Sequence, residues 1–296
     1  MNNQPEISII TPNFNNAGYI EETLQSVISQ KSDQAEYIVV DGASTDDSLK
    51  IINNYKQEID QIISEPDEGQ SDAINKGISQ ASGKWIAFLN SDDYYFENTL
   101  HHFLNAISSN SETSWIVGET HIKDNHNHTF KVRLPLMPKN AYPIDWVSYK
   151  ATSPQPSTFI KKEVFNKIGL FDTSFHYAFD CEFWLRMHIA GYYPTSVKKP
   201  FSVFRIHEDS KTQTSRIPFL TEHRRMLNKH RQHFSTKEIS KAQNILDQLE
   251  AETLSYGLNE SQHFWDDFTS IIHHHPPTVL SRPVLGALKN RLFQSS

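Results

Sequence analysis

The sequence predicts an open α/β sheet, mostly parallel and flanked by helices in the Rossmann-like manner, followed by a helical C-terminal extension. Two observations predict this class. Over the first hundred residues, short apolar runs alternate with amphipathic segments, which is the pattern of strand-helix-strand units. Near Ser215, this pattern gives way to a long stretch with helical spacing and almost no glycine. We therefore expect one domain over residues 1–215 and a helical extension with an amphipathic tail over residues 216–296.

The elements of the first domain follow in a regular order. Four strands are expected at Ile7 to Ile10, Tyr37 to Val40, Gln61 to Ser64 and Trp85 to Leu89. Between them we expect helices at 17–29, 47–55 and 71–80, the last capped by Ser71 or Asp72. Later elements are two strands around a hairpin-like turn at 124–127, a proline-rich loop or edge at 135–156, helices at 161–168 and 178–190, and a strand at 197–206.

Composition narrows the classes of function. The 296 residues include 28 basic and 35 acidic side chains, a net charge of −7, which argues against a nucleic-acid partner. Residues 1–215 carry 18 basic and 27 acidic side chains (−9), whereas 216–296 carry 10 and 8 (+2). The single cysteine, Cys181, excludes an intramolecular disulfide and fits a reducing compartment. The polar start of the chain resembles no signal peptide, so we expect a cytoplasmic protein.

Acidic loops follow three of the four expected strands. Ligands of open α/β sheets bind outside the carboxyl ends of the strands, so we expect the chemistry in these loops. The loops are Thr11-Pro12-Asn13, Asp41 to Asp46, Glu65 to Gly69 and Asn90 to Asp93. In the last loop the adjacent carboxylates of Asp92 and Asp93 could divide the work between a divalent cation and sugar hydroxyls. The simpler alternative is a pair of acids in a turn.

Five motifs in a fixed order point to one family. They are residues 8–15 (SIITPNFN), 39–46 (VVDGASTD), 72–77 (DAINKG), 83–93 (GKWIAFLNSDD) and 179–186 (FDCEFWLR). Together they resemble family 2 glycosyltransferases over about residues 6–211. The resemblance implies a GT-A fold, a nucleotide-sugar donor that we expect to be UDP-linked, a Mn²⁺ or Mg²⁺ ion, and inversion at the anomeric carbon. It assigns residues 1–95 to the nucleotide-sugar half and 96–215 to the acceptor half.

The resemblance assigns roles in the donor site. Thr11, Pro12 and Asn13 would lie where the first strand opens onto the nucleotide, Asp41 would accept a hydrogen bond from the base, and Asp72 and Asn75 would line the nucleoside pocket. Asp92 would contact the ribose and Asp93 would be the direct metal ligand. The family's usual first acid is Asn90 here, so the metal would depend on one carboxylate and the diphosphate.

Two further motifs carry expected roles in the reaction. Asp180, at the start of a helix, matches the general base that deprotonates the acceptor hydroxyl, and Glu182 is the competing candidate. In the closing segment, Arg205 and Lys211 would offset phosphate charge, and His207 would complete the sphere of the ion. A solvated surface histidine is the alternative for His207. Residues 155–159 resemble a family feature near the acceptor.

The C-terminal extension is basic and ends in an apolar stripe. Val284, Leu288 and Leu292 recur every four residues, with Arg282, Lys289 and Arg291 beside them. Such a helix could lie on the inner face of the cell membrane and bring the enzyme to a lipid-linked acceptor. The alternative is packing against the catalytic domain or against a second subunit in a homo-oligomer.

The leading hypothesis is an inverting glycosyltransferase that acts on a saccharide or lipid-linked saccharide in surface-polysaccharide or glycolipid assembly. A sugar-phosphate nucleotidyltransferase would share the sheet and the acids, but it should carry a glycine-rich, arginine-containing loop where this chain has Thr11 to Asn16. A glycosidase needs two carboxylates but no nucleotide pocket. A non-enzymatic sugar-binding module is the remaining alternative.

Overall fold

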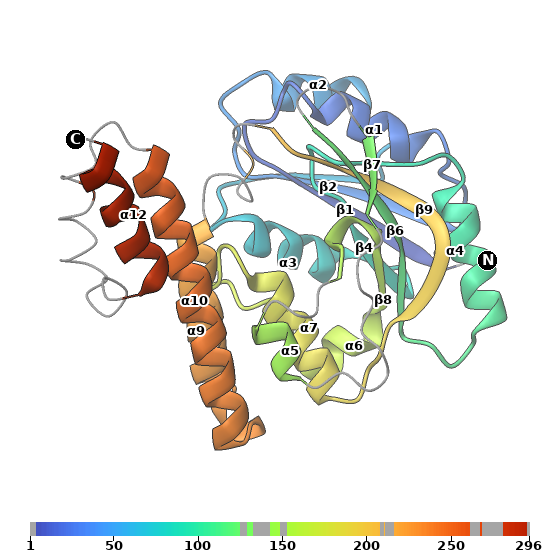
Figure 1. Cartoon of the computed structure of the whole chain (residues 1–296). Coiled ribbons are helices and arrows are strands. Elements are labelled where there is room, and N and C mark those ends of the chain that lie inside the picture. The colour runs from blue at the N-terminus through green and yellow to red at the C-terminus, as the bar shows by residue number, and fades with distance from the viewer. Residues whose placement is uncertain are drawn as a thin grey trace. The chain divides into compact units, whose positions relative to one another are not determined.

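The computed structural model describes residues 4–124, 129–132, 143–148, 153–207, 210, 216–260, 267 and 281–294. The chain forms two compact units. Unit 1 comprises Met1–Tyr142 and Ala151–Gln213, and unit 2 comprises Pro143–Lys150 and Thr214–Ser296. Each unit is described by itself below, with the elements labelled in Figure 1.

The first half of unit 1 is a parallel sheet. Its strands are β1 (Ile7–Asn13), β2 (Ala35–Asp41), β3 (Gln61–Ser64) and β4 (Trp85–Phe88), in the order β3-β2-β1-β4. Every residue of β1 and β4 is buried, as expected for strands that are covered on both faces. The register pairs Asn13 with Asp41, so the polar last residues of β1 and β2 lie side by side at the carboxyl edge of the sheet.

Helices cover both faces of this sheet (Figure 1). They are α1 (Ile20–Ile28), α2 (Ser48–Asn54), α3 (Gln70–Gln80) and α4 (Thr99–Ser109). Helix α1 buries Ile20, Leu24 and Val27 in the core of one face. On the other face α3 lies close to β1, because a Cβ on Gly77 would be 2.5 Å from Ile10 Cγ2. A glycine at this position therefore permits the close packing of helix and strand.

The second half of unit 1 makes the sheet mixed. It contains β5 (Tyr94–Tyr95), β6 (Trp115–Lys123), β7 (Thr129–Val132), η1 (Gln155–Ser157), β8 (Thr158–Lys161), α6 (Lys162–Ile168), α7 (Phe179–Ile189) and β9 (Thr195–Arg205). The sheet continues as β4-β8-β6-β9-β5, in which β6 and β9 are parallel and the other neighbours are antiparallel. The predicted α/β class is thus confirmed, with parallel pairing concentrated in the first four strands.

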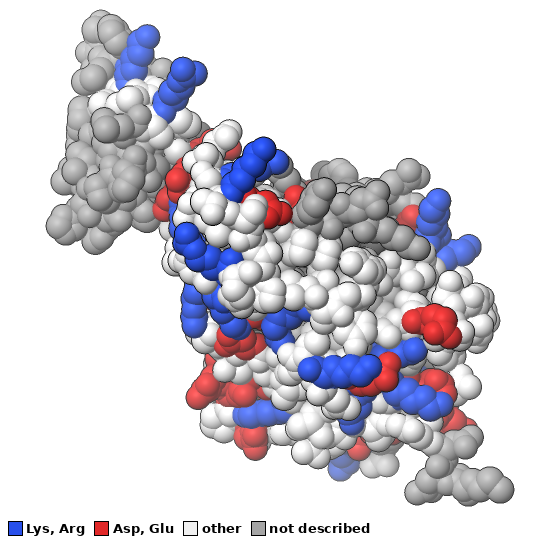
Figure 2. Space-filling view, turned by 90° about the horizontal axis from the view of Figure 1, so that it is seen from below, with Lys and Arg blue, Asp and Glu red and all other residues white. Residues whose placement is uncertain are grey.

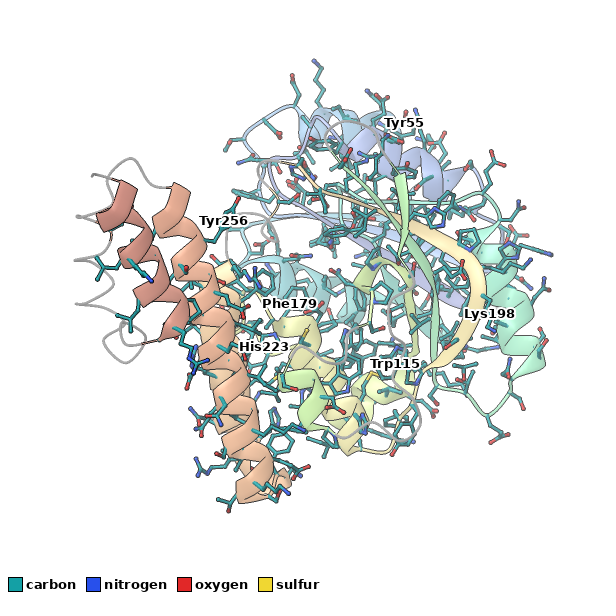
Figure 3. The ribbon with its side chains drawn as sticks, viewed as in Figure 1. Tyr55, Trp115, Phe179, Lys198, His223 and Tyr256 are labelled. Atoms are coloured by element: carbon teal, nitrogen blue, oxygen red, sulfur yellow. The ribbon has the colours of Figure 1, made fainter. Side chains whose placement is uncertain are left out.

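Helix α7 is held by an aromatic layer under the sheet. Phe183 and Trp184 have no exposed surface, and Trp184 stacks on Trp115 of β6 with ring centroids 5.3 Å apart. Figure 3 labels Trp115 and also Phe179, the first residue of α7. Large rings buried on several sides fix a helix strongly. The first turn of α7 is therefore rigidly placed.

Unit 2 is helical. Its elements are α5 (Ile144–Val147), α9 (Arg216–Lys229), η2 (Arg231–His233), α10 (Thr236–Glu260) and α12 (Arg282–Gln294). Helix α9 meets α5 through His223, whose Nδ1 lies 2.9 Å from the carbonyl oxygen of Val147. Arg224 on α9 pairs with Asp247 and Glu250 on α10 at 2.7 and 2.8 Å. Residues distant in the sequence thus form one helical unit.

The apolar stripe of the tail lies against protein. Val284 is fully buried, and with Ala287 and Leu288 it packs against Leu254 and Leu258 of α10. Val284 is therefore not available to a membrane, because α10 removes it from water, and Leu288 is partly covered. The side chain of Leu292 is outside the described residues, and membrane contact by the tail stays a prediction. No helix in the described part of the chain is both long and apolar enough to cross a membrane. On the face shown in Figure 2, basic and acidic side chains are mixed.

Candidate functional site

Asp41 lies at the centre of a hydrogen-bonded cluster where β1, β2 and β3 end. Its carboxylate is fully buried and accepts hydrogen bonds from Asn13 Nδ2 (2.8 Å), from Ser44 Oγ (2.6 Å) and N (3.0 Å), and from Ser64 Oγ (3.1 Å). A carboxylate has about four acceptor positions, so these four donors fill them. A base N–H could bind Asp41 only by displacing one donor, and a serine hydroxyl can rotate away most easily.

Thr11 and Pro12 are buried beneath this cluster. Thr11 Oγ1 lies 3.0 Å from the hydroxyl of Tyr37, so its polar atom is used within the sheet. By contrast, Phe14 leaves the same strand end with 62% of its surface exposed. An exposed aromatic side chain beside a polar site is a candidate for stacking on a base. Sequence reasoning missed Phe14, although its place directly after the strand-end Asn13 was a usable signal.

Asp72 and Asn75 lie on α3 and have protein partners. Asp72 Oδ2 accepts a hydrogen bond from the backbone N–H of Glu68 (3.1 Å) and lies 3.5 Å from Lys76 Nζ. Asn75 binds the backbone of Phe171 twice, through Nδ2 to the carbonyl (2.9 Å) and through Oδ1 from the N–H (3.0 Å). Asn75 therefore joins α3 to the segment that precedes α7, and its expected place in a nucleoside pocket stays a prediction.

Asp92 and His207 meet at the end of β4. Asp92 keeps 24% of its side-chain surface exposed, and its Oδ2 lies 3.0 Å from His207 Nε2. The ring of Tyr19 lies 4.7 Å from the ring of His207 and tilts over it. These residues are far apart in the sequence, and they meet because β9 pairs with β5, placing Val203 opposite Tyr94.

Asp93 points the other way. It has no exposed surface, and Oδ1 accepts a hydrogen bond from the backbone N–H of Arg205 at 3.0 Å. Burial, and secondly the charge of Asp92, raise the pKa of the Asp93 carboxyl well above its ordinary value. A cation can reach Asp92 and not Asp93 in this structure. The expected roles of the two residues stay predictions; the exposure of the two side chains makes Asp92 the more accessible candidate metal ligand, while Asp93 binds the backbone of β9.

Arg205 is engaged away from any open site. Only 6% of it is exposed, and its guanidinium pairs with Glu22 at 2.6 Å, between the rings of Tyr19 (5.3 Å) and Tyr94 (4.7 Å). The expectation that Arg205 offsets phosphate charge is therefore not supported here, because Glu22 already neutralises it. Lys211, the other expected phosphate contact, lies outside the described residues.

The two carboxylates in the first turn of α7 differ in their surroundings. Asp180 is partly exposed, and Oδ1 accepts a hydrogen bond from the backbone N–H of Cys181 at 2.7 Å. Glu182 is fully buried and pairs with Arg186 Nε at 2.8 Å. Arg186 in turn donates to the carbonyl oxygens of Ile168 and Leu170. Glu182 is therefore the less accessible of the two candidate bases, since its carboxylate is buried and paired with Arg186.

Three side-chain amides meet beside the acids. Asn90 Oδ1 accepts hydrogen bonds from Gln70 Nε2 (2.6 Å) and Gln155 Nε2 (2.9 Å), and Asn90 Nδ2 donates to Gln155 Oε1 (3.2 Å). We call these residues the amide cluster. Gln155 was expected near the acceptor, but the structure places it against the residue that replaces the family's first acid.

Asp92 and His207 are the candidate residues for a divalent ion. Two ligand atoms that each lie about 2.1 Å from an octahedral ion are about 3.0 Å apart when they are adjacent in its coordination sphere. Asp92 Oδ2 and His207 Nε2 are joined by a hydrogen bond of 3.0 Å, so an ion would replace this hydrogen bond without the two atoms having to move apart. Within the described part of the chain, no group of three or more His, Cys, Asp or Glu side chains could hold a metal.

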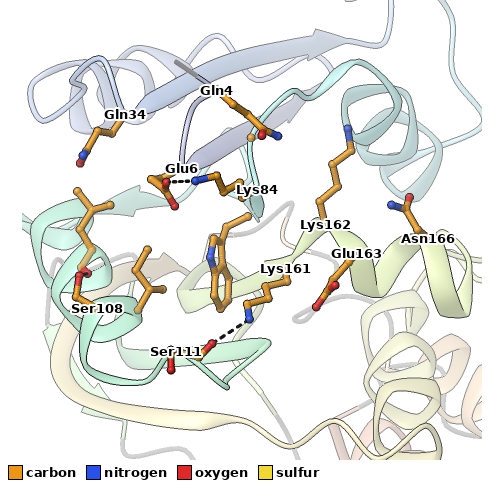
Figure 4. A pocket seen from close by; sticks show the side chains of 14 residues that line it. Gln4, Glu6, Gln34, Lys84, Ser108, Ser111, Lys161, Lys162, Glu163 and Asn166 are labelled. Carbon is orange, nitrogen blue, oxygen red and sulfur yellow. Dashed lines mark hydrogen bonds and ion pairs between the residues drawn. The ribbon is translucent and has the colours of Figure 1, made fainter. Parts of the chain in front are cut away.

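A hollow of about 810 Å³ lies at the opposite edge of the sheet (Figure 4). Its lining includes Glu6, Lys84 and Lys161, at or near the ends of β1, β4 and β8. Glu6 pairs with Lys84, and Lys161 Nζ donates to the carbonyl of Ser111 at 3.1 Å. Ligands of parallel α/β sheets bind at the carboxyl edge, so we do not place the reaction in this hollow.

The sheet order and the acids at its carboxyl edge define the GT-A class, the fold of nucleotide-sugar transferases. The chain belongs to glycosyl transferase family 2, whose family model matches residues 8–169. This match confirms the resemblance that the five sequence motifs indicated.

Relatives of this chain are named as glycosyltransferases. TuaG of Bacillus subtilis, assigned to teichuronic acid biosynthesis, is 37% identical over 100 residues, which are 33% of this chain and 40% of TuaG. An uncharacterized glycosyltransferase of Rickettsia prowazekii is 28% identical over 186 residues, 62% of this chain and 58% of the relative. The chain therefore spans about half the length of these relatives.

Solved structures share the fold. TarS 1–349 of S. aureus in complex with UDP-GlcNAc has a TM-score of 0.63 at 18% identity, covering 96% of this chain and 80% of that one. The mannosyltransferase PcManGT of Pyrobaculum calidifontis, in complex with GDP-Man and Mn²⁺, has a TM-score of 0.61 at 17% identity, covering 99% and 89%. At these identities the likeness concerns the fold.

Proposed function

We propose that this protein is an inverting glycosyltransferase that moves a sugar from a UDP-linked donor to a hydroxyl of a saccharide or lipid-linked saccharide. The observation that carries the proposal is the pairing of Asp92 with His207 at the carboxyl edge of the parallel strands. Family membership supports the reaction class. The assembly of a surface polysaccharide or glycolipid is supported by TuaG and by a Mycobacterium bovis relative named for PGL/p-HBAD biosynthesis.

The nucleoside would bind over the ends of β1 and β2. Asp41 would accept the ring N–H of uracil after one of its serine donors rotates away, while Asn13 keeps the carboxylate in place. Phe14 would cover the face of the base. Uracil is the base we propose; among proteins of this fold, TarS has been solved with UDP and with UDP-GlcNAc and PcManGT with GDP-Man, so guanine is the alternative to test.

Asp92 and His207 would hold a Mn²⁺ or Mg²⁺ ion, and imidazole as a ligand favours Mn²⁺. When bound, the ion neutralises charge on the leaving diphosphate. Other residues of this chain would keep the two ligands in position. Asp93 binds the backbone of Arg205 and thereby holds the end of β9, and the ring of Tyr19 packs against the ring of His207. The chain would thus present one carboxylate and one imidazole to the donor.

Asp180 would remove the proton from the acceptor hydroxyl. It lies in the first turn of an 11-residue helix whose buried aromatic side chains fix its position. The positive end of the helix favours the ionised carboxylate, which is the form a general base needs. Acceptor binding at a membrane would have to use the outward face of α12, with Arg282, Leu285 and Lys289 exposed, since its apolar stripe is covered.

Calorimetric titration with UDP tests the proposal. We expect UDP to bind the full chain in the presence of Mn²⁺ and to bind much more weakly after the ion is removed with a chelator. Without the ion, the carboxylate of Asp92 repels the negatively charged diphosphate, and no ion bridges the two. GDP and CDP are the controls for the base. If no nucleoside diphosphate binds with Mn²⁺ or Mg²⁺, the proposal is wrong, and a glycosidase or a sugar-binding module becomes the better hypothesis.

A further inference from the structure

The amide cluster is built from three separate segments. Gln70 is the first residue of α3, Asn90 follows β4, and Gln155 opens η1. All three are partly buried, and their three mutual hydrogen bonds span 2.6 to 3.2 Å. Side-chain amides are costly to bury unless they are satisfied, and apolar residues would join these segments more simply. The three amides satisfy one another in part, and the hydrogen-bonding capacity that is left could serve a polar ligand.

The place of the cluster indicates which part of the donor it meets. Asn90 stands two residues before Asp92, and its Nδ2 lies 3.5 Å from Asp93 Oδ2. On the other side, Gln70 follows Gly69, where a Cβ would lie 3.5 Å from His176 Nδ1, and His176 stands four residues before Asp180. The cluster thus lies in the loop that carries the proposed metal ligand, where it contacts the buried Asp93, and its other end lies near the segment that precedes the proposed base.

We propose that Gln70, Asn90 and Gln155 bind the hydroxyl groups of the donor sugar and select a neutral hexose or N-acetylhexosamine over a hexuronate. This inference rests on the proposed function. In an inverting transfer, the base acts on the side of the anomeric carbon opposite the diphosphate, so the sugar occupies the space between Asp92 and Asp180. The proposal places the amide cluster at the border of that space.

The chemistry of the amides fits sugar hydroxyls. An amide offers both donors and an acceptor, and a hydroxyl needs both. Among the described residues, the Gln70 side chain makes one hydrogen bond, which leaves its oxygen and one N–H for a ligand. The carboxylate of a hexuronate would lie near the carboxylate of Asp92. Arg205 would not offset its charge, because Arg205 already forms an ion pair with Glu22. Repulsion by Asp92 would therefore disfavour a hexuronate.

A purely structural cluster would behave differently. If the amides only join α3, β4 and η1, their loss should lower thermal stability and weaken UDP and every UDP-sugar equally. If they bind the sugar, their loss should leave UDP binding unchanged. The ratio of the two dissociation constants is therefore the diagnostic quantity, and it does not depend on the stability of a variant that folds.

The experiment measures the binding of UDP, UDP-glucose, UDP-GlcNAc and UDP-glucuronate to the full chain with Mn²⁺. We compare the wild type with Gln70→Leu and Gln155→Leu, which keep the side-chain bulk, and with Gln4→Leu, a control whose amide binds the carbonyl of Ser82 at the amino edge. We expect the dissociation constant for a neutral UDP-sugar to rise about fivefold or more in both cluster variants, the loss of about one hydrogen bond, while that for UDP stays within about twofold.

The outcomes separate this inference from the proposed function. Failure of the wild type to bind any nucleoside diphosphate would overturn the proposed function. Normal UDP binding with an unchanged ratio in both cluster variants would overturn the sugar-binding role alone. If the variants do not fold, the wild type still decides the selectivity: UDP-glucuronate binding as tightly as UDP-glucose and UDP-GlcNAc would show that the site does not select a neutral sugar.

Discussion

At the scale of single residues, surroundings separate side chains that look equivalent in the sequence. Asp180 and Glu182 lie one turn apart at most, yet only Asp180 keeps exposed surface, while Glu182 is closed in with Arg186. Asp92 and Asp93 are adjacent, yet one reaches His207 and the other reaches the backbone of Arg205. Each pair therefore offers a matched test, in which one substitution changes chemistry and the other changes structure.

Asp180→Asn should keep donor binding and lose transfer. The amide preserves the hydrogen bond from the Cys181 N–H but cannot accept a proton, and loss of a general base costs roughly 10² to 10⁴ in rate. Glu182→Gln should instead lower stability by about 1 to 3 kcal/mol, because it leaves the partly buried Arg186 without its counter-charge, while the folded fraction keeps its rate. Transfer rates and urea unfolding of both variants check this; a Glu182→Gln enzyme that is stable but inactive would reverse the assignment.

Asp92→Asn should abolish the effect of Mn²⁺ on UDP binding, because it removes one of the two protein ligands. Asp93→Asn should keep that effect, since its Oδ1 still accepts from the Arg205 N–H and the residue faces inward. Titration of both variants with UDP, with and without Mn²⁺, makes the comparison. Loss of the metal effect in Asp93→Asn alone, with Asp92→Asn unaffected, would restore Asp93 as the ligand.

At the scale of elements, the covered face of α12 determines what the tail can do. Val284 is fully buried against α10, whereas its neighbour Leu285 is 42% exposed. Val284→Ala should cost on the order of 2 kcal/mol in the unfolding of unit 2, and Leu285→Ala less than about 0.5 kcal/mol. Chemical unfolding followed by circular dichroism measures both. Equal and small effects would mean that α12 is not packed on α10 in solution.

The junction of α9 and α5 should make unit 2 sensitive to acid. Burial lowers the pKa of His223 to about 4, so between pH 6.5 and 4 the unfolded chain binds a proton that the folded chain does not. Stability should therefore fall as the pH drops through this range, by up to about 3 kcal/mol. His223→Asn, whose amide can still donate to Val147, should flatten this fall in urea titrations at pH 7 and pH 4.5. An identical pH dependence in both proteins would rule out His223 as the cause.

At the scale of the whole molecule, unit 2 combines two distant parts of the chain. Residues 143–150 belong to it together with 214–296, and Trp146 and Val147 on α5 have no exposed surface. Truncation after residue 215 should therefore expose Trp146 and produce aggregation, although the whole described sheet of unit 1 remains. Light scattering and thermal unfolding of the truncated chain measure this, with Trp146→Gln in the truncated chain expected to reduce aggregation. A truncated chain as soluble and stable as the full one would contradict it.

Much of the architecture could be predicted from local pattern. Strands β1 to β4 and helices α1 to α3 begin and end within a few residues of the expected positions, because buried parallel strands give unbroken apolar runs and amphipathic helices separate them. The placement of Asp41 and Asp92 at one edge followed from the same pattern, since parallel strands end on the same side of a sheet. The strand pairing in the second half of unit 1 could not be predicted from local pattern, because β8 and β9 pair with strands far from them in the sequence.

By itself, the sequence determined the fold class, the family and the loops that carry the chemistry, all of which depend on periodicity and on ordered motifs. Only the tertiary structure decided which carboxylate of each pair is open, that Gln155 meets Asn90, and that α10 covers the stripe of α12. The physical reason is that burial and hydrogen-bond partners come from segments tens to more than a hundred residues away. A local pattern shows that a face will be covered, but the covering element is set by the packing of the whole chain.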